Sequence, residues 1–253
     1  MNTEISLASC TRVSLVVATL NSERHLREAL TSISNQTYAP HEVIVIDGGS
    51  IDSTKVIAES FPFVTFRKQE GIGYHRAWNQ GIAISTGEVI GFLDSDDKLT
   101  PHAIELSMQA LNSTSNIDLV FGKVKFFSDS VEIPPRFRRA LLVGDYHAEV
   151  PGSMLVKRDL FMQFGTFPED WEMLSDLAWF ARLRTSEYRI FLHQHLVLEK
   201  RVHSDSLSYS FSSQSLYRSE LLRLGRERFS SIKERREIPK ESGADPSPLQ
   251  QFK

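Results

Sequence analysis

The sequence predicts an α/β fold in which an open, mainly parallel sheet is flanked by helices. Short β-branched apolar runs alternate with segments of helical periodicity through about the first 110 residues. Unusual polar residues directly follow several of these runs. Four strand–helix units in this order require right-handed crossovers, which make the strands parallel and place helices on both faces. At 253 residues, the chain is long enough to bury a sizeable core.

The first unit begins with the apolar run at residues 13–18, which is too short for a helix and predicts a buried strand. Asn21 or Ser22 fits the N-cap of the helix that follows. This helix has one apolar face with the spacing i, i+3, i+4 and i+7. Its members are Leu26, Ala29, Leu30 and Ile33.

Three more units follow with the same order of strand and helix. Their strands are predicted at residues 42–46, 63–66 and 88–93. Val56 and Ile57 begin a short helical face. Another helix is expected over residues 76–84, and Gly87 suits the position after it. Thr100 and Pro101 then fit the N-cap and first position of a helix. Its buried side is expected to hold Ile104, Met108 and Leu111.

The second half of the chain has lost this regular order. Residues 118–127, 189–192 and 195–202 are predicted strands. Residues 128–150 are expected to form a mobile loop, with a basic group made by Arg136, Arg138 and Arg139. One helix face is predicted from Leu174, Leu177, Ala178 and Ala181. Residues 1–237 are expected to form a single domain, followed by a polar, disordered tail at 238–253.

Charge and cysteine usage exclude several classes of protein. The 32 acidic and 29 basic residues give a net charge of −3, so the chain lacks the positive field of a nucleic-acid binder. The single cysteine, Cys10, makes no internal disulfide or multi-cysteine metal site. Neither a signal peptide nor an apolar run of about 20 residues is recognisable. We therefore expect a cytoplasmic protein that does not span a membrane.

The strongest chemical signal is the acidic run Asp94, Ser95, Asp96, Asp97 at the end of a predicted strand. Three carboxylates this close repel one another unless a cation or hydrogen-bond donors lie between them. A divalent Mg²⁺ or Mn²⁺ ion that also binds a diphosphate satisfies this need. An acidic turn that caps the next helix is the alternative. A calcium-binding loop is excluded because Leu99 stands where that loop needs glycine.

Two further loops, residues 18–23 after the first strand and residues 47–50 after the second, are expected to face the same crevice as the acidic run, at the edge where ligands of open α/β sheets bind. Asp47, with Gly49 close behind it, fits either a tight turn or a carboxylate that binds a nucleoside. The loop with Gly73 and Arg76 lacks the third glycine of a dinucleotide site, but it can wrap a diphosphate. A solvated Arg76 at a helix start fits equally well.

Four ordered strings, at residues 13–23, 42–54, 77–87 and 92–97, together resemble the family-2 glycosyltransferases of the GT-A fold, of bacterial surface-polysaccharide type. The resemblance covers about residues 12 to 205. It implies a Rossmann-like nucleotide-diphospho-sugar transferase sheet. It also implies three parts of the chain: a donor half at 12–122, an acceptor and catalytic half at 123–210, and a C-terminal helix at 211–237.

The resemblance also implies which residues bind the nucleotide-sugar and a divalent cation. In the family, the loop after the first strand and the aspartate after the second hold the nucleoside, and an Asp-x-Asp element holds ribose and a diphosphate-bound metal. The implied donor-binding residues are Ala18, Thr19, Asn21, Glu23, Asp47, Gly49, Gly73, Arg76, Asn79, Asp94, Ser95 and Arg201. The implied metal ligands are Asp96, Asp97 and His203.

The family places its catalytic base on a helix that follows a Gly-x-Phe element, usually as a Glu-Asp pair. Here Ser175 stands where glutamate is usual, and Asp176 takes the role of the base. Glu169, Asp170 and Glu172 are the candidates if the register differs. A carboxylate at the edge of an apolar helix suits proton transfer because burial raises its pKa. A surface aspartate in a first helical turn fits the same residues.

The C-terminal helix has an excess of basic residues over 216–237, seven against four acidic ones. A helix lying on an anionic membrane and a packed helix with a solvated charged face both fit this pattern. The basic residues are Arg218, Arg223, Arg226, Arg228, Lys233, Arg235 and Arg236, and the acidic ones are Glu220, Glu227, Glu234 and Glu237.

These expectations combine into an inverting, metal-assisted glycosyltransferase that moves a sugar from a UDP-sugar to a glycan or lipid-linked acceptor in polysaccharide biosynthesis, at the inner face of the membrane. Two other functions stay open. A sugar nucleotidyltransferase shares the sheet and the acidic site, but it needs a glycine-rich basic loop where Ala18 and Thr19 stand. A nucleotide-sugar-binding module without catalysis fits the same donor residues.

Overall fold

The computed structural model describes residues 11–226, apart from 115, 131, 136, 185–187, 205 and 207–214. Its sheet strands are β1 (Val13–Thr19), β2 (Glu42–Asp47), β3 (Val64–Lys68), β4 (Val89–Asp94), β5 (Lys98–Leu99), β6 (Leu119–Phe127), β7 (Tyr146–His147), β8 (Met154–Lys157) and β9 (Ile190–Arg201). Its α-helices include α1 (Leu26–Ser34), α2 (Thr54–Glu59), α3 (Tyr74–Ile84), α4 (Ala103–Asn112), α5 (Asp159–Phe164) and α6 (Ser175–Leu183). A further helix covers residues 215–226. The predicted tail at 238–253 and Arg136 lie outside the described residues.

The strands form one sheet in the order β3-β2-β1-β4-β8-β6-β9-β5, with β7 paired to β6. The first four strands, β1 to β4, are parallel to one another, as the sequence predicts. From β8 onward the sheet is mixed, because β8 runs antiparallel to both of its neighbours and β5 runs antiparallel to β9. The α/β class is therefore confirmed, and its parallel character is strongest in the first half.

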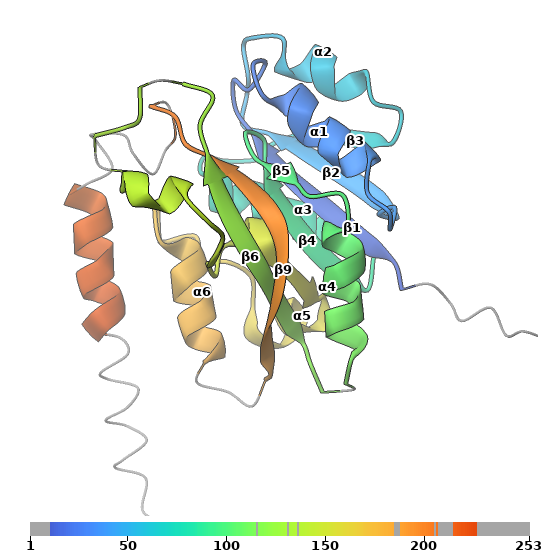
Figure 1. Cartoon of the computed structure of the whole chain (residues 1–253), viewed down its shortest axis with the longest axis vertical. Helices are drawn as coiled ribbons and strands as arrows, with labels where there is room; N and C mark the ends of the chain where they lie inside the picture. Colours follow the sequence, from blue (N-terminus) through green and yellow to red (C-terminus); the bar gives the residue numbers. More distant parts are fainter. Residues whose placement is uncertain are drawn as a thin grey trace, which may run out of the picture.

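Helices cover both faces of this sheet (Figure 1). One apolar core packs α1, α2 and α4 against strand residues such as Leu15 and Val45. The other packs α3, α5 and α6 against residues of opposite parity, such as Val16 and Ile44. Strand alternation thus assigns successive side chains to two separate cores, which holds the sheet rigidly between them.

Close packing of α3 on the sheet depends on Gly81. A Cβ atom at this position would lie 2.2 Å from a methyl group of Val16 on β1. Any side chain at residue 81 therefore pushes α3 away from the strand. The position of α3 matters for the site because its first turn contains Arg76 and directly follows Gly73.

Three helix details differ from the sequence prediction. Helix α1 begins at Leu26 rather than after Asn21 or Ser22, because the carbonyl of Ser22 first accepts the backbone N–H groups of residues 25 and 26 in a turn. Helix α4 likewise begins at Ala103, two residues later than a start at Pro101. Val56 is 71% exposed, because α2 turns its Ile57 side to the core instead.

The second half also departs from prediction. The two strands expected at residues 189–192 and 195–202 are one strand, β9, which stays paired to β6 across register shifts between Phe121 and Val124. The region expected to be a loop, 128–150, contains a 3₁₀ helix (Arg139–Leu142) and β7 in its described part. On α6, Leu177 and Ala181 are only partly buried, whereas Trp179, Phe180 and Leu183 form the core face.

Parallel pairing brings the ends of β1, β2 and β4 to one edge. Thr19 lies beside Asp47, and Ala18 lies beside Asp94. The predicted meeting of these three strand ends is therefore confirmed.

Candidate active site

The acidic run after β4 forms a compact cluster. Carboxylate oxygens of Asp94, Asp96 and Asp97 lie within 4.8 Å of one another. Asp97 is 1% exposed, whereas Asp94 and Asp96 are only partly buried. The three carboxylates therefore need positive charge close by, as their spacing in the sequence indicates.

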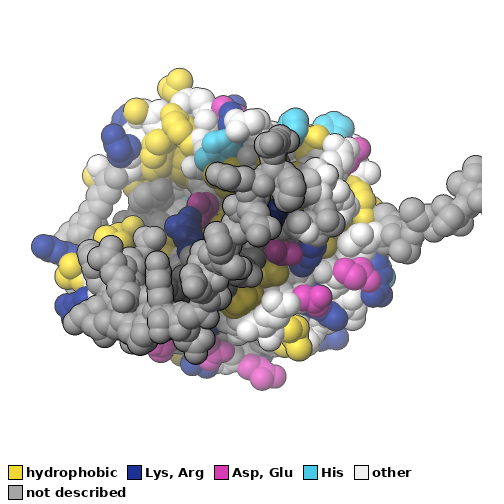
Figure 2. Space-filling model, turned by 90° about the horizontal axis from the view of Figure 1, so that it is seen from below, with side chains coloured by type: hydrophobic (Ala, Val, Ile, Leu, Met, Phe, Trp, Pro, Cys, Tyr) yellow, Lys and Arg dark blue, Asp and Glu magenta, His cyan; other side chains and the backbone are white. Residues whose placement is uncertain are grey.

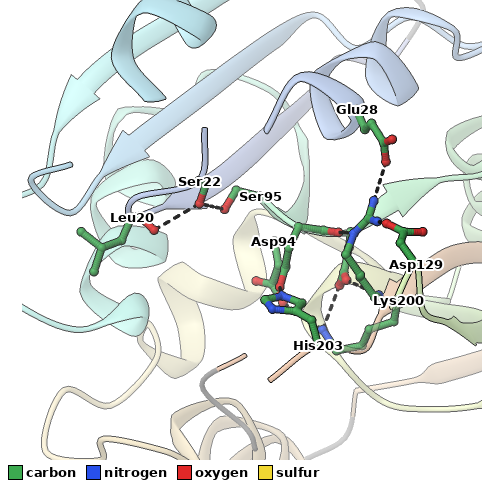
Figure 3. A network of polar contacts seen from close by, with 11 residues as sticks. Leu20, Ser22, Glu28, Asp94, Ser95, Asp129, Lys200 and His203 are labelled. Carbon is green, nitrogen blue, oxygen red and sulfur yellow. Dashed lines mark hydrogen bonds and ion pairs between the residues drawn. The ribbon is translucent and has the colours of Figure 1, made fainter. Parts of the chain in front are cut away.

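Lys200 supplies part of this charge, and the sequence analysis did not predict it. Its ammonium group lies 2.8 Å from an Asp97 oxygen and 3.1 Å from an Asp94 oxygen (Figure 3). Burial alone would lower the pKa of Lys200, but the three aspartates raise it well above its usual value. Lys200 reaches the cluster because β9 passes beside β5, directly after the acidic run. The sequence shows a lysine near the end of a predicted strand, but no local pattern indicates that this strand lies beside the acidic run.

Arg201 has a structural place in this cluster. The side chain is 3% exposed, and its Nε donates to the carbonyl of Asp96 at 2.8 Å. The guanidinium also forms ion pairs with Glu28 on α1 and with Asp129 (Figure 3). The backbone N–H of Arg201 donates to Asp97 at 2.8 Å. These bonds fix the acidic turn, so Arg201 faces protein groups rather than an open donor site.

Asp96 and His203 form the pair that suits a metal ion. Nε2 of His203 lies 2.9 Å from an oxygen of Asp96, and both side chains are partly exposed. Burial alone would raise the pKa of Asp96, but the His203 hydrogen bond and the Lys200 charge lower it overall. One carboxylate oxygen and one imidazole nitrogen fit Mn²⁺ well, and a carboxylate also suits Mg²⁺. Asp97, also predicted as a metal ligand, instead has both oxygens bound by Lys200 and Arg201.

Asp47 adopts the tight-turn geometry, which was one of the two alternatives that the sequence allows for this residue. One of its oxygens accepts the backbone N–H groups of Gly49 and Ser50, at 3.1 and 3.0 Å. Its other oxygen accepts the hydroxyl of Ser50. Gly49 has a φ of +97°, which favours glycine. The carboxylate thus shapes the loop after β2.

The loops after β1 and β2 are bonded to each other. Oδ1 of Asn21 accepts the N–H of Ile51 at 3.0 Å, and Asn21 itself has a φ of +47°. An oxygen of Glu23 accepts the N–H of Ser53 at 3.0 Å. Asn21 and Glu23, both predicted donor-binding residues, therefore hold the two loops together.

Three hydroxyl residues lie at the donor edge: Thr19 and Ser95, which are buried, and Ser22, which is partly buried. The hydroxyl of Thr19 is buried and has no hydrogen-bond partner among the described residues. Ser22 and Ser95 share a hydrogen bond of 2.7 Å between their hydroxyls (Figure 3). A buried hydroxyl without a partner costs free energy unless a ligand or water satisfies it. Thr19 is therefore the donor-binding prediction with the clearest unmet polar group.

Arg76 and Asn79 connect α3 to the second half of the chain. Asn79 bonds both the carbonyl and the N–H of Phe167, at 2.8 and 3.0 Å. Arg76 forms an ion pair with Glu169 at 3.2 Å. Gly73, with a φ of +107°, precedes α3. The amide of Asn79 is satisfied inside the protein, so its place is in the contact between the two halves.

Asp176 lies in the first turn of α6. Burial and, to a smaller extent, the nearby Asp94 carboxylate raise the pKa of Asp176, backbone N–H groups and Lys200 lower it, and the result is a pKa of about 6. Asp176 therefore lies close enough to the acidic cluster for the charges of Asp94 and Lys200 to act on it. A carboxylate with such a pKa accepts a proton near neutral pH.

The residues around Asp176 have structural partners. Ser175 is fully buried, and its hydroxyl donates to the carbonyl of Pro168 at 2.8 Å. Asp170 is bound by Arg223 from helix 215–226, and Glu169 is bound by Arg76. Glu172 is exposed. Among the acidic residues of this segment, Asp176 has the strongest electrostatic link to the cluster.

An open sheet with this strand order and an acidic turn after β4 defines the GT-A class of fold. The chain matches the family model "Glycosyl transferase family 2" over residues 14–168, and it therefore belongs to that family. An uncharacterized glycosyltransferase of Rickettsia typhi is 30% identical over 76% of this chain and 64% of its own length. Glycosyltransferase AglE of Haloferax volcanii is 27% identical, again over 64% of its length. The chain thus spans less than two thirds of these relatives.

Solved structures support the same fold. Staphylococcus aureus TarS superposes with a TM-score of 0.61 at 19% identity, over 77% of this chain and 37% of that one. Glucosyl-3-phosphoglycerate synthase of Mycobacterium tuberculosis, solved with Mn²⁺, UDP and phosphoglyceric acid, gives 0.57 at 20% identity, over 91% and 80%. Mannosyltransferase PcManGT of Pyrobaculum calidifontis, solved with GDP-Man and Mn²⁺, gives 0.58 at 22%, over 80% and 59%.

The surface bears on how the chain meets its surroundings. Basic and acidic side chains lie interspersed over the described part of the face in Figure 2. Within the described residues, none of the helices has the length and apolar character needed to cross a bilayer. On helix 215–226 the apolar side chains of Tyr217, Leu221 and Leu222 are 45%, 48% and 57% exposed, while Glu220 is buried. This helix therefore has one face packed and another open.

Proposed function

We propose that the chain is an inverting glycosyltransferase that moves a sugar from a UDP-sugar to an acceptor hydroxyl, with Asp176 as the base. The observation that carries the proposal is the position of Asp176 in the first turn of α6, near enough to Asp94 and Lys200 for both charges to act on its pKa. A carboxyl with a pKa of about 6 near the acidic cluster supports the role of a base. The UDP and Mn²⁺ bound by the Mycobacterium tuberculosis synthase support the choice of nucleotide and ion.

In the proposed reaction, Asp176 accepts the proton of the acceptor hydroxyl. The acceptor oxygen then forms a bond to the anomeric carbon from the face opposite UDP, and the bond from that carbon to the diphosphate oxygen breaks. UDP leaves with the electron pair of that bond, so the anomeric configuration inverts. Holding the hydroxyl and the donor in line accounts for much of the acceleration.

Asp96 and His203 are proposed to hold the divalent ion, with Asp94 beside them. When bound there, Mn²⁺ or Mg²⁺ supplies positive charge that stabilises the departing diphosphate. Asp97 and Lys200 support this site by fixing the acidic turn. The unsatisfied hydroxyl of Thr19 is proposed to bind the nucleoside.

Calorimetric titration with UDP tests the donor site. We expect binding that needs Mn²⁺ and is lost in EDTA, and that Asp96→Ala weakens. Binding without metal dependence, or equal binding by Asp96→Ala, would contradict the metal site.

A second assay separates the transferase from a binding module without catalysis. The protein is incubated with UDP-glucose, UDP-N-acetylglucosamine and GDP-mannose, and nucleotide release is measured. Slow hydrolysis of one donor that Asp176→Asn abolishes is the expected result. Tight donor binding with no hydrolysis of any donor favours the module instead.

We propose further that the acceptor is lipid-linked, that the product belongs to a polysaccharide, and that helix 215–226 contacts an anionic membrane. The open face of this helix combines apolar Tyr217, Leu221 and Leu222 with the exposed basic residues Arg218 and Arg226. This combination is typical of helices that lie in a lipid interface. Sedimentation with vesicles tests it: binding to phosphatidylglycerol vesicles and not to phosphatidylcholine vesicles is expected. Indifference to both would overturn it.

A further inference from the structure

We propose that Glu220 is a positioning residue for the base: its carboxylate holds the backbone at residues 172–174 and thereby fixes the first turn of α6. The inference rests on the proposed role of Asp176. The inference adds helix 215–226 to the site. Glu220 lies 44 residues after Asp176 in the chain, beyond the family match over residues 14–168.

The contacts of Glu220 are unusually complete. Its side chain is 6% exposed, and one carboxylate oxygen accepts the N–H of Glu172 at 2.6 Å. The other oxygen accepts the N–H groups of Met173 and Leu174, at 3.0 and 2.8 Å. Three backbone donors thus converge on one buried anion. Hydrogen bonds to a charged acceptor are roughly twice as strong as those between neutral groups.

These N–H groups lie at the start of the helix that carries the base. Leu174 is the N-cap of α6, and Asp176 is in its first turn. The N-terminal N–H groups of a helix lack partners within the helix, and an anion beside them is favoured by the helix dipole. Glu220 therefore supplies, from a distant helix, the acceptor for the N–H of the N-cap residue Leu174 and for the two N–H groups before it, so it anchors the chain where it enters α6. No side-chain cap is present at Leu174 itself.

Two neighbours of Glu220 hold the same segment. The guanidinium of Arg223 donates to the carbonyl of Asp170 at 3.1 Å and lies 4.2 Å from the ring centre of Trp171. Leu224 packs against the small apolar cluster of Trp171, Leu174 and Ala178. Helix 215–226 thus contacts the segment through a buried anion, a cation and an apolar side chain.

The donor half holds the segment from its other side. The hydroxyl of Tyr74, in the first residue of α3, donates to the carbonyl of Met173 at 2.8 Å. Residue 173 is therefore fixed through its N–H by Glu220 and through its carbonyl by Tyr74. This peptide joins the donor-binding half, the helix of the base and the C-terminal helix.

Precise placement matters because a base acts only within hydrogen-bond reach of the proton it accepts. A shift of about 1 Å in a catalytic group can cost a factor of about 100 in rate. Loss of Glu220 would leave three N–H groups without their acceptor and free the segment before α6. The expected defect is in the chemical step, since the donor loops after β1 and β2 do not contact this segment in any described hydrogen bond.

The test compares Glu220→Ala and Glu220→Gln with Ser219→Ala, a matched control at an exposed neighbour on the same helix. The UDP-sugar that the parent hydrolyses is the substrate, and kcat, KM and Mn²⁺-dependent UDP binding are measured. Glu220→Ala is expected to lower kcat by about 10- to 100-fold and to leave UDP binding at the parent level. Glu220→Gln keeps one acceptor oxygen and is expected to recover part of kcat. Ser219→Ala is expected to match the parent.

Combination with Asp176→Asn separates positioning from general damage. If Glu220 acts through Asp176, adding Glu220→Ala to Asp176→Asn leaves the residual rate unchanged. Hydrogen exchange at residues 172–174 is expected to speed up in Glu220→Ala. A kcat loss no larger than in Ser219→Ala, an equal further loss in the Asp176→Asn background, or unchanged exchange would each overturn the proposal.

Failure of the proposed function is distinguishable from failure of this inference. Full hydrolysis by Asp176→Asn would remove the base assignment, whatever Glu220 does. Inactive Asp176→Asn together with fully active Glu220→Ala would remove only the role of Glu220. If Glu220→Ala does not fold, as judged by lost UDP binding, Glu220→Gln carries the same comparisons.

Discussion

Asp97 and Asp176 both lie near the acidic cluster, yet Asp97 is fully buried whereas Asp176 is partly buried. Burial raises the pKa of Asp176 to about 6, and it also favours the neutral form of Asp97, but at Asp97 the Lys200 ammonium opposes that shift. Asp97 is bound by the Lys200 ammonium and the N–H of Arg201. Asp176 is instead held by backbone N–H groups, its own and that of Leu177. Burial alone therefore does not identify a base, because the partners decide whether a carboxylate anchors the fold or takes up a proton.

Replacing Asp176 by asparagine should have the largest effect on rate. We expect hydrolysis of the UDP-sugar to fall by about 10³-fold, the range for loss of a general base, while UDP binding stays unchanged. In the parent, kcat/KM should rise with pH and level off above about pH 6, because the base must be deprotonated to act. A rate that does not change between pH 5 and pH 7 would contradict this assignment.

Replacing Asp97 by asparagine should have the largest effect on stability. The change leaves the partly buried Lys200 ammonium without its nearest carboxylate, and breaking such a pair costs about 2 to 3 kcal/mol in the free energy of unfolding. Urea unfolding measures the loss. Glu199→Gln is the control, because Glu199 precedes Lys200 on β9 and forms a partly exposed ion pair with Lys98 on β5. Its loss should cost less than about 1 kcal/mol.

The same substitution at Asp176 should act in the opposite direction on stability. The pKa of Asp176 is higher in the folded chain than its ordinary value of 3.8, so the folded state binds more protons between pH 3.8 and about 6. Stability from this group is therefore full below that interval and falls as the pH rises through it. Asp176→Asn should raise the free energy of unfolding by about 1 to 2 kcal/mol at pH 7. Equal losses in both Asp→Asn variants would erase the contrast between the two acids.

The smallest expected effect concerns the proposed metal pair. His203→Ala should weaken Mn²⁺-dependent UDP binding by about tenfold and leave the free energy of unfolding near that of the parent, because the ring is partly exposed. His102→Ala is the control, since that histidine pairs with Glu105 on the surface. Equal UDP affinity in both variants would remove His203 from the site.

The sequence predicted best what depends on local pattern and on parallel pairing. Thr19, Asp47 and Asp94 each follow an apolar run, and parallel strands necessarily bring such positions to one edge. The class of fold and the acidic cluster were predictable for that reason. The roles of individual residues at this edge were less so, because Asp47 and Asn21 have bonds to backbone groups that no spacing reveals.

Contacts between distant elements were not predictable. Lys200 reaches Asp97 because β9 is inserted beside β6 and crosses to β5, across register shifts that the alternation of residues 189–202 does not show. The buried position of Glu220 could not be predicted for a different reason. A charged side chain in a basic helix usually faces solvent, and nothing in the local sequence sets Glu220 apart. Only the docking of helix 215–226 turns it inward. Val56 illustrates the same limit on a small scale, because a short helix has too few residues to define its buried face.

The position of Glu220 has a practical consequence for choosing fragments of this protein. The sheet is already complete at Arg201, so a fragment ended shortly after β9 would contain every strand and the whole acidic cluster. It would nevertheless lack the acceptor for three backbone N–H groups beside α6. Such a fragment is expected to crystallise or bind nucleotide while turning over poorly. Boundaries drawn from the sheet alone would then lead an experimenter to mistake a truncated enzyme for an inactive one.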